Sequence, residues 1–311
     1  MRALVVRAFG DPDVLEVADV PVPAPGPGQI RVKVAGSSVN PIDLSTRSGA
    51  LAHGGLLVRA PVTAIGWDVA GTVDAVGAGV TRFAAGDAVV GLRDILSSVP
   101  GAQAEQVVLD QSAVARAPQS ASLVEAATLP LNGLTADGAL ALSGVGPGDT
   151  LLVTGAAGAV GGYVLQLAAL RGVRTIAVAS AADEALVREL GASDFVARAD
   201  TLAQPVRDVV PGGVDAVIDT AVLGIAAHEA LRGGGTFVAL VRPFAPPPIR
   251  GTRVLVHESF ADGARLAELS ALVDAGHLTL RVAGTLPLSE AAQAHERFVQ
   301  GGLRGRLVLV P

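Results

Sequence analysis

The stretch that most constrains the fold is a glycine-rich turn, Val-Thr-Gly-Ala-Ala-Gly-Ala-Val-Gly at residues 153–161. A short apolar run that is typical of a buried strand precedes it, and apolar residues at helical spacing follow it. Gly155 permits a tight turn, Gly158 permits close approach of the backbone to a pyrophosphate, and Gly161 permits close packing of helix on strand. The helix N-terminus, with its positive dipole end, then faces the anion. The pattern predicts nucleotide binding, and the alternative is a glycine-rich turn without a ligand.

The composition indicates a globular protein with a large apolar core. Half of the 311 residues are hydrophobic and 17% are charged, which argues against disorder. The net charge of −6 argues against a nucleic-acid partner, because such a partner requires a basic face. The absence of cysteine excludes disulfides, a cysteine nucleophile and thiolate metal sites. We expect a cytoplasmic protein that does not cross a membrane, since no apolar stretch reaches the roughly 18 residues of a spanning helix and the N-terminus does not resemble a signal peptide.

The strand and helix patterns divide the chain into two expected domains. Residues 1–117 contain short strand-like runs between proline and glycine turns, which indicates a β-rich domain. Residues 118–257 alternate strand-like and helical stretches, as in a doubly wound α/β domain that binds its ligand at the carboxyl ends of the strands. Residues 258–311 are too few for another domain, so we expect them to complete the first one.

The expected elements can be stated by residue range. In the α/β domain the strands are residues 150–153, 174–179, 194–197, 214–219, 235–241 and 252–257. In the outer segments the strands include residues 3–7, 30–34, 69–76, 88–90, 278–286 and 306–310, and the helices are residues 262–275 and 289–300.

Further motifs extend in order along nearly the whole chain. They are Val-Asn-Pro-Ile-Asp at 39–43, Gly-Trp-Asp-Val-Ala-Gly-Thr-Val at 66–73, Leu-Pro-Leu-Asn-Gly-Leu-Thr at 129–135, the glycine turn, and Gly-Arg-Leu-Val-Leu at 305–309. Together they resemble the zinc-free quinone oxidoreductase branch of the medium-chain dehydrogenase/reductase superfamily, the branch that includes zeta-crystallin. The resemblance implies a GroES-like catalytic domain interrupted by a Rossmann domain. It also implies hydride transfer from a reduced nicotinamide to a small-molecule quinone or an activated C=C bond.

The same resemblance implies an enzyme without zinc. Asn40 stands where the zinc-dependent relatives have a cysteine ligand, and Trp67 stands where they have a histidine. Residues 91–110 contain none of the clustered cysteines of a structural zinc site, and the five histidines are scattered along the chain. We therefore expect no metal, and we assign the redox chemistry to the cofactor.

The resemblance also implies which residues meet the substrate. Asn40 would lie at the nicotinamide end of the site and donate a hydrogen bond to the reacting oxygen, or else it only holds the turn before Pro41. Ser45 stands where the family often has a tyrosine, which leaves Ser45 or water as the proton donor. Trp67 matches a wall of the substrate pocket, with core packing as the alternative.

The cofactor is expected to be NADPH. The second strand of the α/β domain ends at Ser180, without the acidic residue that binds the ribose 2′-hydroxyl in NAD-specific sites. Ser180 leaves space for a 2′-phosphate, and Arg198 matches a family position near that phosphate, although it could also be a solvated surface residue. By resemblance, the remaining cofactor contacts are Asn40, Thr135, Ala156, Ala157, Ala159, Val160, Thr220, Leu240 and Val241.

The last strand of the α/β domain, residues 252–257, predicts a homodimer. It would be an exposed apolar edge of an open sheet, and pairing across a two-fold axis would cover it. Two other functions fit the same motifs. One is an enoyl reductase dedicated to a single biosynthetic enone, and the other is a non-catalytic NADPH-binding protein with a sensor or structural role.

Overall fold

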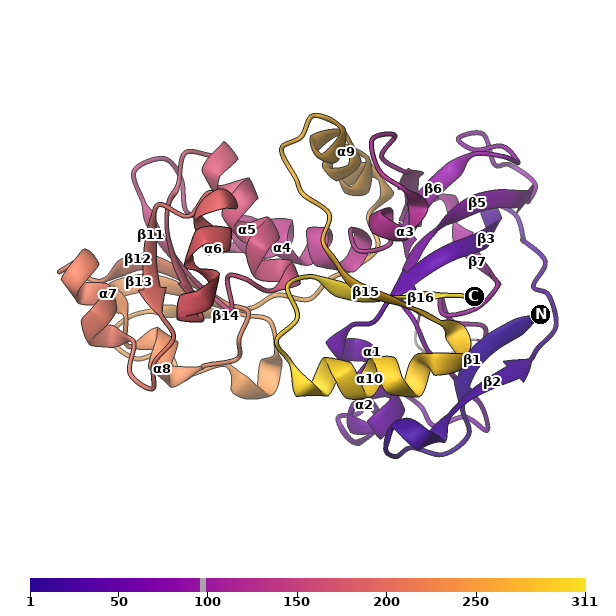
Figure 1. Ribbon diagram of the computed structural model, residues 1–311, viewed down its shortest axis with the longest axis horizontal. Helices are drawn as coiled ribbons and strands as arrows, with labels where there is room; N and C mark the ends of the chain where they lie inside the picture. Colours follow the sequence, from indigo (N-terminus) through magenta and orange to yellow (C-terminus); the bar gives the residue numbers. More distant parts are fainter. Residues whose placement is uncertain (96–98) are drawn as a thin grey trace. The chain divides into compact units, whose positions relative to one another are not determined.

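The computed structural model describes residues 1–95 and 99–311 and divides them between two units. Unit 1 comprises residues 1–131, 260–276 and 280–311, and unit 2 comprises residues 132–259 and 277–279 (Figure 1). The chain therefore passes from unit 1 into unit 2 and back. The domain limits expected from the sequence, 117/118 and 257/258, remain a prediction.

Unit 2 is built on a six-stranded parallel sheet with the strand order β11-β10-β9-β12-β13-β14. Five of the six expected strands lie within two residues of their expected limits at both ends. The exception is β13, which begins at Leu231 because residues 233–235, three glycines, continue a strand instead of ending it. In chain order the elements are α4 (Pro130–Ser143), β9 (Thr150–Thr154), α5 (Ala159–Leu170), β10 (Arg174–Ala179), η3 (Ala181–Asp183), α6 (Glu184–Glu189), β11 (Asp194–Ala197), α7 (Ala203–Val209), β12 (Val214–Asp219), α8 (Ile225–His228), β13 (Leu231–Ala239), η4 (Arg242–Phe244) and β14 (Arg253–Val256).

Helices cover both faces of this sheet. Right-handed crossovers on either side of β9 place α5 and α6 on one face and α7 and α8 on the other (Figure 1). Every residue of β9 is buried as a result. On the α7/α8 face, Leu152 and Ile176 share a core cluster with Val206 and Ala227. A strand buried on both faces must be apolar throughout, which explains why these strands could be recognised from the sequence.

The strand order reverses between β9 and β12. The chain proceeds outward from β9 through β10 to β11, and then returns to add β12 on the other side of β9. Doubly wound sheets bind their ligands at such a reversal, beyond the carboxyl ends of the strands. Two segments meet at this position, the glycine turn after Thr154 and the loop after Asp219.

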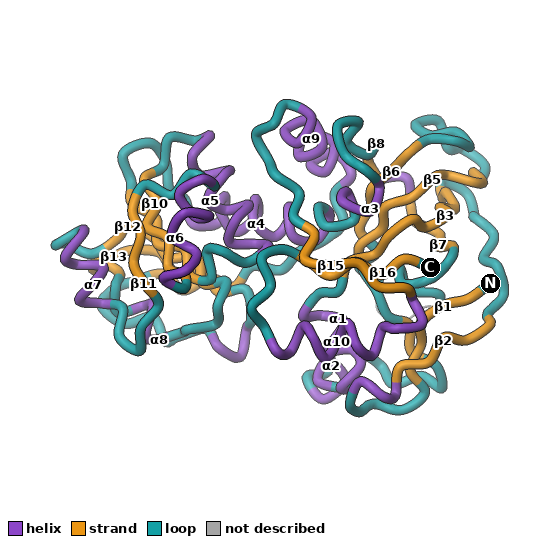
Figure 2. The backbone as a smooth tube through the Cα atoms, in the orientation of Figure 1, coloured by secondary structure: helices purple, strands orange, loops and turns teal. Residues whose placement is uncertain are grey.

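Unit 1 contains a three-stranded sheet, β2-β1-β4, and a larger seven-stranded sheet in which β3 pairs with β5, β7 and β16. Figure 2 shows these strands in orange with short helices between them. Its elements are β1 (Arg2–Val6), η1 (Pro12–Val14), β2 (Leu15–Asp19), β3 (Gln29–Ser38), α1 (Pro41–Ser48), α2 (Ala50–His53), β4 (Thr63–Ala64), β5 (Asp68–Val76), β6 (Ala88–Leu92), β7 (Gln106–Asp110), η2 (Gln111–Ala113), β8 (Val114–Arg116), α3 (Leu123–Ala126), α9 (Gly263–Asp274), β15 (Val282–Pro287), η5 (Leu288–Glu290), α10 (Ala291–Gln300) and β16 (Arg306–Val310).

Several expectations for unit 1 are corrected by its pairing. Strand β3 continues to Ser38 rather than ending at Val34, because the small residues that follow pair with β5 and then with β16. Strand β15 begins at Val282 rather than at residue 278, and α1 and α2 lie in a segment that was expected to be mainly strands. Within the described residues, no helix combines the length and hydropathy that a membrane span requires.

Candidate functional site

The glycine turn follows β9 and ends at Gly158, the N-cap of α5, so the helix begins earlier than the sequence pattern indicated. Gly155 has a φ of +59°, which favours glycine, and a Cβ there would lie 2.7 Å from the Thr220 hydroxyl. A Cβ on Gly161 would collide with the carbonyl oxygen of Gly155. These two glycines are therefore required by the fold itself.

Gly158 differs from its two neighbours in the motif. Its φ is −73°, which any residue can adopt, and a Cβ there would approach only the Gly155 carbonyl oxygen, at 3.1 Å. The protein thus leaves space in front of the N-terminus of α5, a twelve-residue helix whose positive dipole end favours an anion. This local geometry fits a pyrophosphate. Ala156 and Ala157 are buried within the turn, and Ala159 and Val160 form the first turn of the helix.

Asp219, at the end of β12, holds the neighbouring loop against this turn. Its Oδ1 accepts a hydrogen bond from the Thr154 hydroxyl at 2.6 Å, and its Oδ2 accepts one from the Gly224 N–H at 2.8 Å. Thr220, expected at the cofactor site, donates its hydroxyl to the Thr154 carbonyl at 2.6 Å. Asp219 was not among the expected residues, but an acidic residue at the carboxyl end of a mostly apolar strand was the available signal.

Ser180 and Arg198 lie side by side at the same edge of the sheet. They directly follow the paired residues Ala179 and Ala197, and the Arg198 N–H donates to the Ala179 carbonyl at 2.7 Å. The Arg198 side chain is exposed and Ser180 is half-buried. The nearby Asp183 lies in η3, at the start of α6, as expected for a carboxylate near a helix N-terminus.

Thr135 lies on α4, and its hydroxyl is hydrogen bonded to the Ser259 hydroxyl at 2.7 Å. Ser259 in turn contacts Nε2 of His257 at 3.2 Å. Neither Ser259 nor His257 was expected from the sequence. Leu240 and Val241 follow β13, and Val241 is exposed.

In unit 1, Asn40 is fully buried and caps the N-terminus of α1. Its side-chain nitrogen donates to Oδ2 of Asp68 at 2.7 Å and to the Ser38 hydroxyl at 3.1 Å. Ser38 also donates to Asp68, and the Leu131 N–H donates to the other carboxylate oxygen at 2.6 Å. The amide of Asn40 is thus held by a buried carboxylate, and burial raises the pKa of Asp68.

A second buried carboxylate, Asp43, stands beside this group. The N–H groups of Asn40 and Gly66 donate to it at 2.8 and 3.2 Å. Burial raises the pKa of Asp43 to about 8, although both N–H donors act in the opposite direction. Ser45 is half-buried on α1, and Trp67 is half-buried just before β5, so Trp67 is not part of the closed core.

Metal ligands do not cluster in the part of the chain that the structure describes, because no three His, Cys, Asp or Glu residues come together there. The carboxylates of Asp43 and Asp68 are instead satisfied by N–H and O–H donors.

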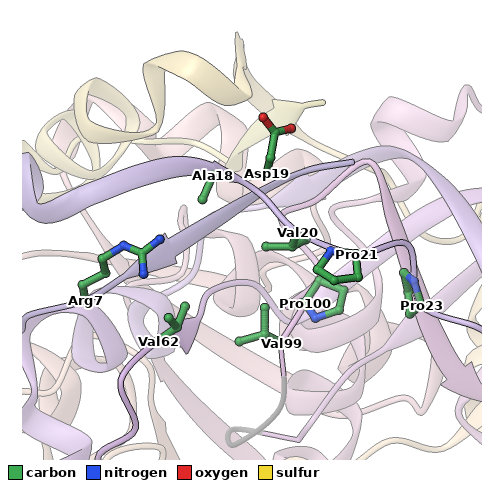
Figure 3. Close-up of a pocket in the computed structure, with 9 residues that line it drawn as sticks. All are labelled: Arg7, Ala18, Asp19, Val20, Pro21, Pro23, Val62, Val99 and Pro100. Carbon is green, nitrogen blue, oxygen red and sulfur yellow. The ribbon is translucent and has the colours of Figure 1, made fainter.

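A cavity of about 430 Å³ lies against β1 and β2 in unit 1 (Figure 3). Arg7, at its edge, pairs with Glu16 at 3.0 Å. The lining contains none of the residues expected to meet substrate or cofactor; it consists of Arg7, Ala18, Asp19, Val20, Pro21, Pro23, Val62, Val99 and Pro100.

Comparisons with known proteins agree along the whole chain. Residues 26–119 match the alcohol dehydrogenase GroES-like domain, and residues 190–309 match a zinc-binding dehydrogenase domain. The quinone oxidoreductase of Lama guanicoe is 30% identical over 329 residues, covering 100% of this chain and 97% of that protein. The chloroplastic NADPH-dependent alkenal/one oxidoreductase of Arabidopsis thaliana is 29% identical, covering 100% of this chain and 80% of that protein. A mycobacterial protein solved in complex with NADPH superimposes with a TM-score of 0.86 at 31% identity, with complete coverage of both chains.

Proposed function

Because this chain belongs to the quinone oxidoreductase branch of the medium-chain dehydrogenase/reductase superfamily, we propose that it is a zinc-independent, NADPH-dependent reductase of quinones or activated C=C bonds. The observation that carries the proposal is the space at Gly158, at the reversal of strand order in an NAD(P)-binding fold. Bound NADPH would supply a hydride from its nicotinamide. The protein would bind the pyrophosphate, position the reactants and provide a proton.

NADPH is proposed over NADH because of the two strand ends that carry Ser180 and Arg198. A 2′-phosphate at this edge would meet a small hydroxyl and an exposed guanidinium, and no acidic residue ends β10 to repel it. NADH would make neither phosphate contact.

Metal independence is proposed from the side chains where the zinc-dependent relatives have ligands. The chain has no cysteine. The amide of Asn40 and the indole of Trp67 stand where the zinc-dependent relatives have a cysteine and a histidine ligand. The hydrogen bonds of Asn40 to Asp68 and Ser38 would fix the orientation of its amide. We infer that Asn40 orients the reactants and that half-buried Trp67 forms an apolar wall for the substrate ring.

A homodimer in the cytoplasm is the proposed working state. Strand β14 is the edge of the sheet in unit 2, and its residues Val254, Leu255 and Val256 are only half-buried. Such an edge offers unpaired backbone groups to a second copy.

The test is NADPH oxidation, followed by absorbance, with a naphthoquinone and with an α,β-unsaturated ketone. Turnover with simple quinones supports the proposal. Turnover restricted to one enone would favour the dedicated enoyl reductase. NADPH binding with no turnover on any acceptor would contradict the proposal and favour the non-catalytic alternative.

A further inference from the structure

Three side chains in unit 2 form a continuous hydrogen-bonded chain. The hydroxyls of Thr135 and Ser259 are 2.7 Å apart, and Ser259 Oγ is 3.2 Å from His257 Nε2. Either hydroxyl can be the donor in the first contact, and the imidazole can donate or accept in the second. Hydrogen bonds that can run in both directions allow a proton to pass along the chain.

Helix α4 holds this arrangement through a second residue on the same face. Gly138 lies three residues after Thr135, which places both on one side of the helix. A Cβ on Gly138 would collide with the His257 ring, so the imidazole occupies the space that the missing side chain leaves. Glycine destabilises the interior of a helix relative to alanine, so its presence here calls for a packing reason. Seating the imidazole provides that reason.

The charged groups around His257 leave it able to exchange protons. Burial lowers the pKa of its imidazole, while the nearby carboxylates of Asp137 and Glu258 oppose that shift. Both carboxylates have cationic partners, Arg171 at 2.5 Å from Asp137 and Arg242 at 2.5 Å from Glu258. His257 is half-buried, and its Nε2 contacts the Ser259 hydroxyl.

We propose that His257 supplies the proton that completes reduction, through Ser259 and then Thr135. The proposal rests on the proposed function, because it requires Thr135 to lie at the reacting end of the cofactor. It replaces Ser45 as the candidate donor, since Ser45 has no comparable connection among the hydrogen bonds described above.

In an enone the carbon that accepts the hydride is the one β to the carbonyl. Hydride addition to the carbon β to the carbonyl moves the C=C electron pair toward the carbonyl and leaves an enolate oxygen. The Thr135 hydroxyl gives its proton to that oxygen, Ser259 reprotonates Thr135, and the His257 imidazolium reprotonates Ser259 from Nε2. The neutral imidazole then takes a proton from solvent, and the product enol becomes the ketone.

The first test uses the pH profile of kcat with an enone. In the wild type, kcat falls as pH rises through the His257 pKa, because the relay needs the imidazolium. In His257→Gln and Ser259→Ala we expect kcat to drop about 100-fold, the lower range for a lost general acid, and to lose this pH dependence. Thr135→Ser keeps a hydroxyl and should retain the pH dependence of kcat, whereas Thr135→Val should lose it. Exposed His277 provides the matched control, and His277→Gln should behave as wild type.

A second readout does not depend on turnover. The imidazole of His257 can be titrated by NMR, with and without NADPH. If its Nε2 is coupled through Ser259 to Thr135, NADPH binding shifts the His257 titration in the wild type and not in Ser259→Ala. The NADPH affinity of Ser259→Ala, measured by fluorescence titration, should be unchanged. Gly138→Ala should displace the ring and produce the same loss of pH dependence as His257→Gln.

The outcomes separate this inference from the proposed function. If the wild type turns over quinones or enones and His257→Gln keeps the wild-type pH profile, the relay is wrong and the function stands. If the wild type oxidises NADPH with none of the acceptors tested, the proposed function is wrong, and an unshifted His257 titration on NADPH binding would overturn the relay as well.

Discussion

Buried His295 should make unit 1 less stable at mildly acidic pH than at neutral pH. The side chain lies on α10 with no exposed surface, and neither ring nitrogen has a hydrogen-bond partner in the described part of the chain. Burial and the neighbouring Arg47 guanidinium lower the pKa of His295 to about 4, from an ordinary value of 6.5. Protonation would therefore place a second positive charge beside Arg47 in a closed core.

The sign and size of the change in stability with pH follow from the difference in the pKa of His295 between the folded and the unfolded chain. Between about pH 6.5 and pH 4 the unfolded chain binds a proton at His295 that the folded chain does not, so stability falls as the pH falls. The lower pKa of His295 in the folded chain, about 4 against 6.5, corresponds to about 3 kcal/mol. Most of this, roughly 2–3 kcal/mol, should be lost between about pH 7.5 and about pH 4.5.

Urea unfolding measures this loss, and Trp67 supplies the signal. Trp67 is the single tryptophan and lies in unit 1, as does His295. In His295→Leu the acid-dependent loss of stability should shrink by roughly 2–3 kcal/mol relative to the wild type. At neutral pH the variant should be at least as stable, because it removes a buried polar group without a partner. The control is His277→Leu at an exposed position, which should keep the wild-type pH dependence. The same loss in His295→Leu as in the wild type would refute the reasoning.

Five further predictions concern the proposed function. Gly158→Val should abolish NADPH binding while the chain stays folded, since its φ of −73° brings no strain; unchanged affinity by fluorescence titration would show that the turn is structural only. Arg198→Ala should weaken NADPH binding by about 1.5–3 kcal/mol, or roughly 10- to 100-fold in Kd, and leave the affinity for NADH nearly unchanged. Equal losses of affinity for both cofactors, measured at one salt concentration, would contradict the phosphate contact. Ser180→Asp should move the preference toward NADH in the same titrations, because its carboxylate repels the 2′-phosphate, and a preserved NADPH preference would count against it. Turnover should survive chelation, and stoichiometric zinc that is lost together with activity would overturn this expectation. Light scattering at micromolar concentration should show a dimer, which we expect to pair through β14. A monomer would overturn this second expectation.

The Rossmann part of the fold was predictable because the central strands of its sheet are buried and mostly apolar. Five of the six strands matched their expected limits closely. The glycine turn was equally clear, since the geometry at Gly155 and Gly161 is set by contacts a few residues away. In unit 1 the local sequence pattern was insufficient to predict where strands end. The end of β3 is determined by its pairing with β16, more than 250 residues later in the chain.

The candidate site was less predictable, for the same physical reason. Asp68 is part of a motif that the sequence shows, but its bonds to Ser38 and Asn40 depend on how β3 and β5 are brought together. His257 and Ser259 join Thr135 across 122 and 124 residues of sequence, so no local spacing signals their contact. The roles assigned to Asn40, Ser45 and Trp67 remain predictions, because their positions do not by themselves show what they bind.

The pairing of β16 with β3 has a consequence for biosynthesis. Val308 and Leu309 pair with Ser37 and Ser38, and the Val39 N–H donates to the Leu307 carbonyl at 2.9 Å. During translation, unit 2 has nearly all of its residues long before residues 306–310 are made, whereas the strand leading to Asn40 lacks its neighbour until then. Unit 2 can therefore form on the ribosome, and the larger sheet of unit 1 can be completed only afterwards. A chain that ends before residue 306 would contain all residues of unit 2 but would leave an open sheet edge at the end of β3 in unit 1, and such an edge promotes aggregation and removal by proteases.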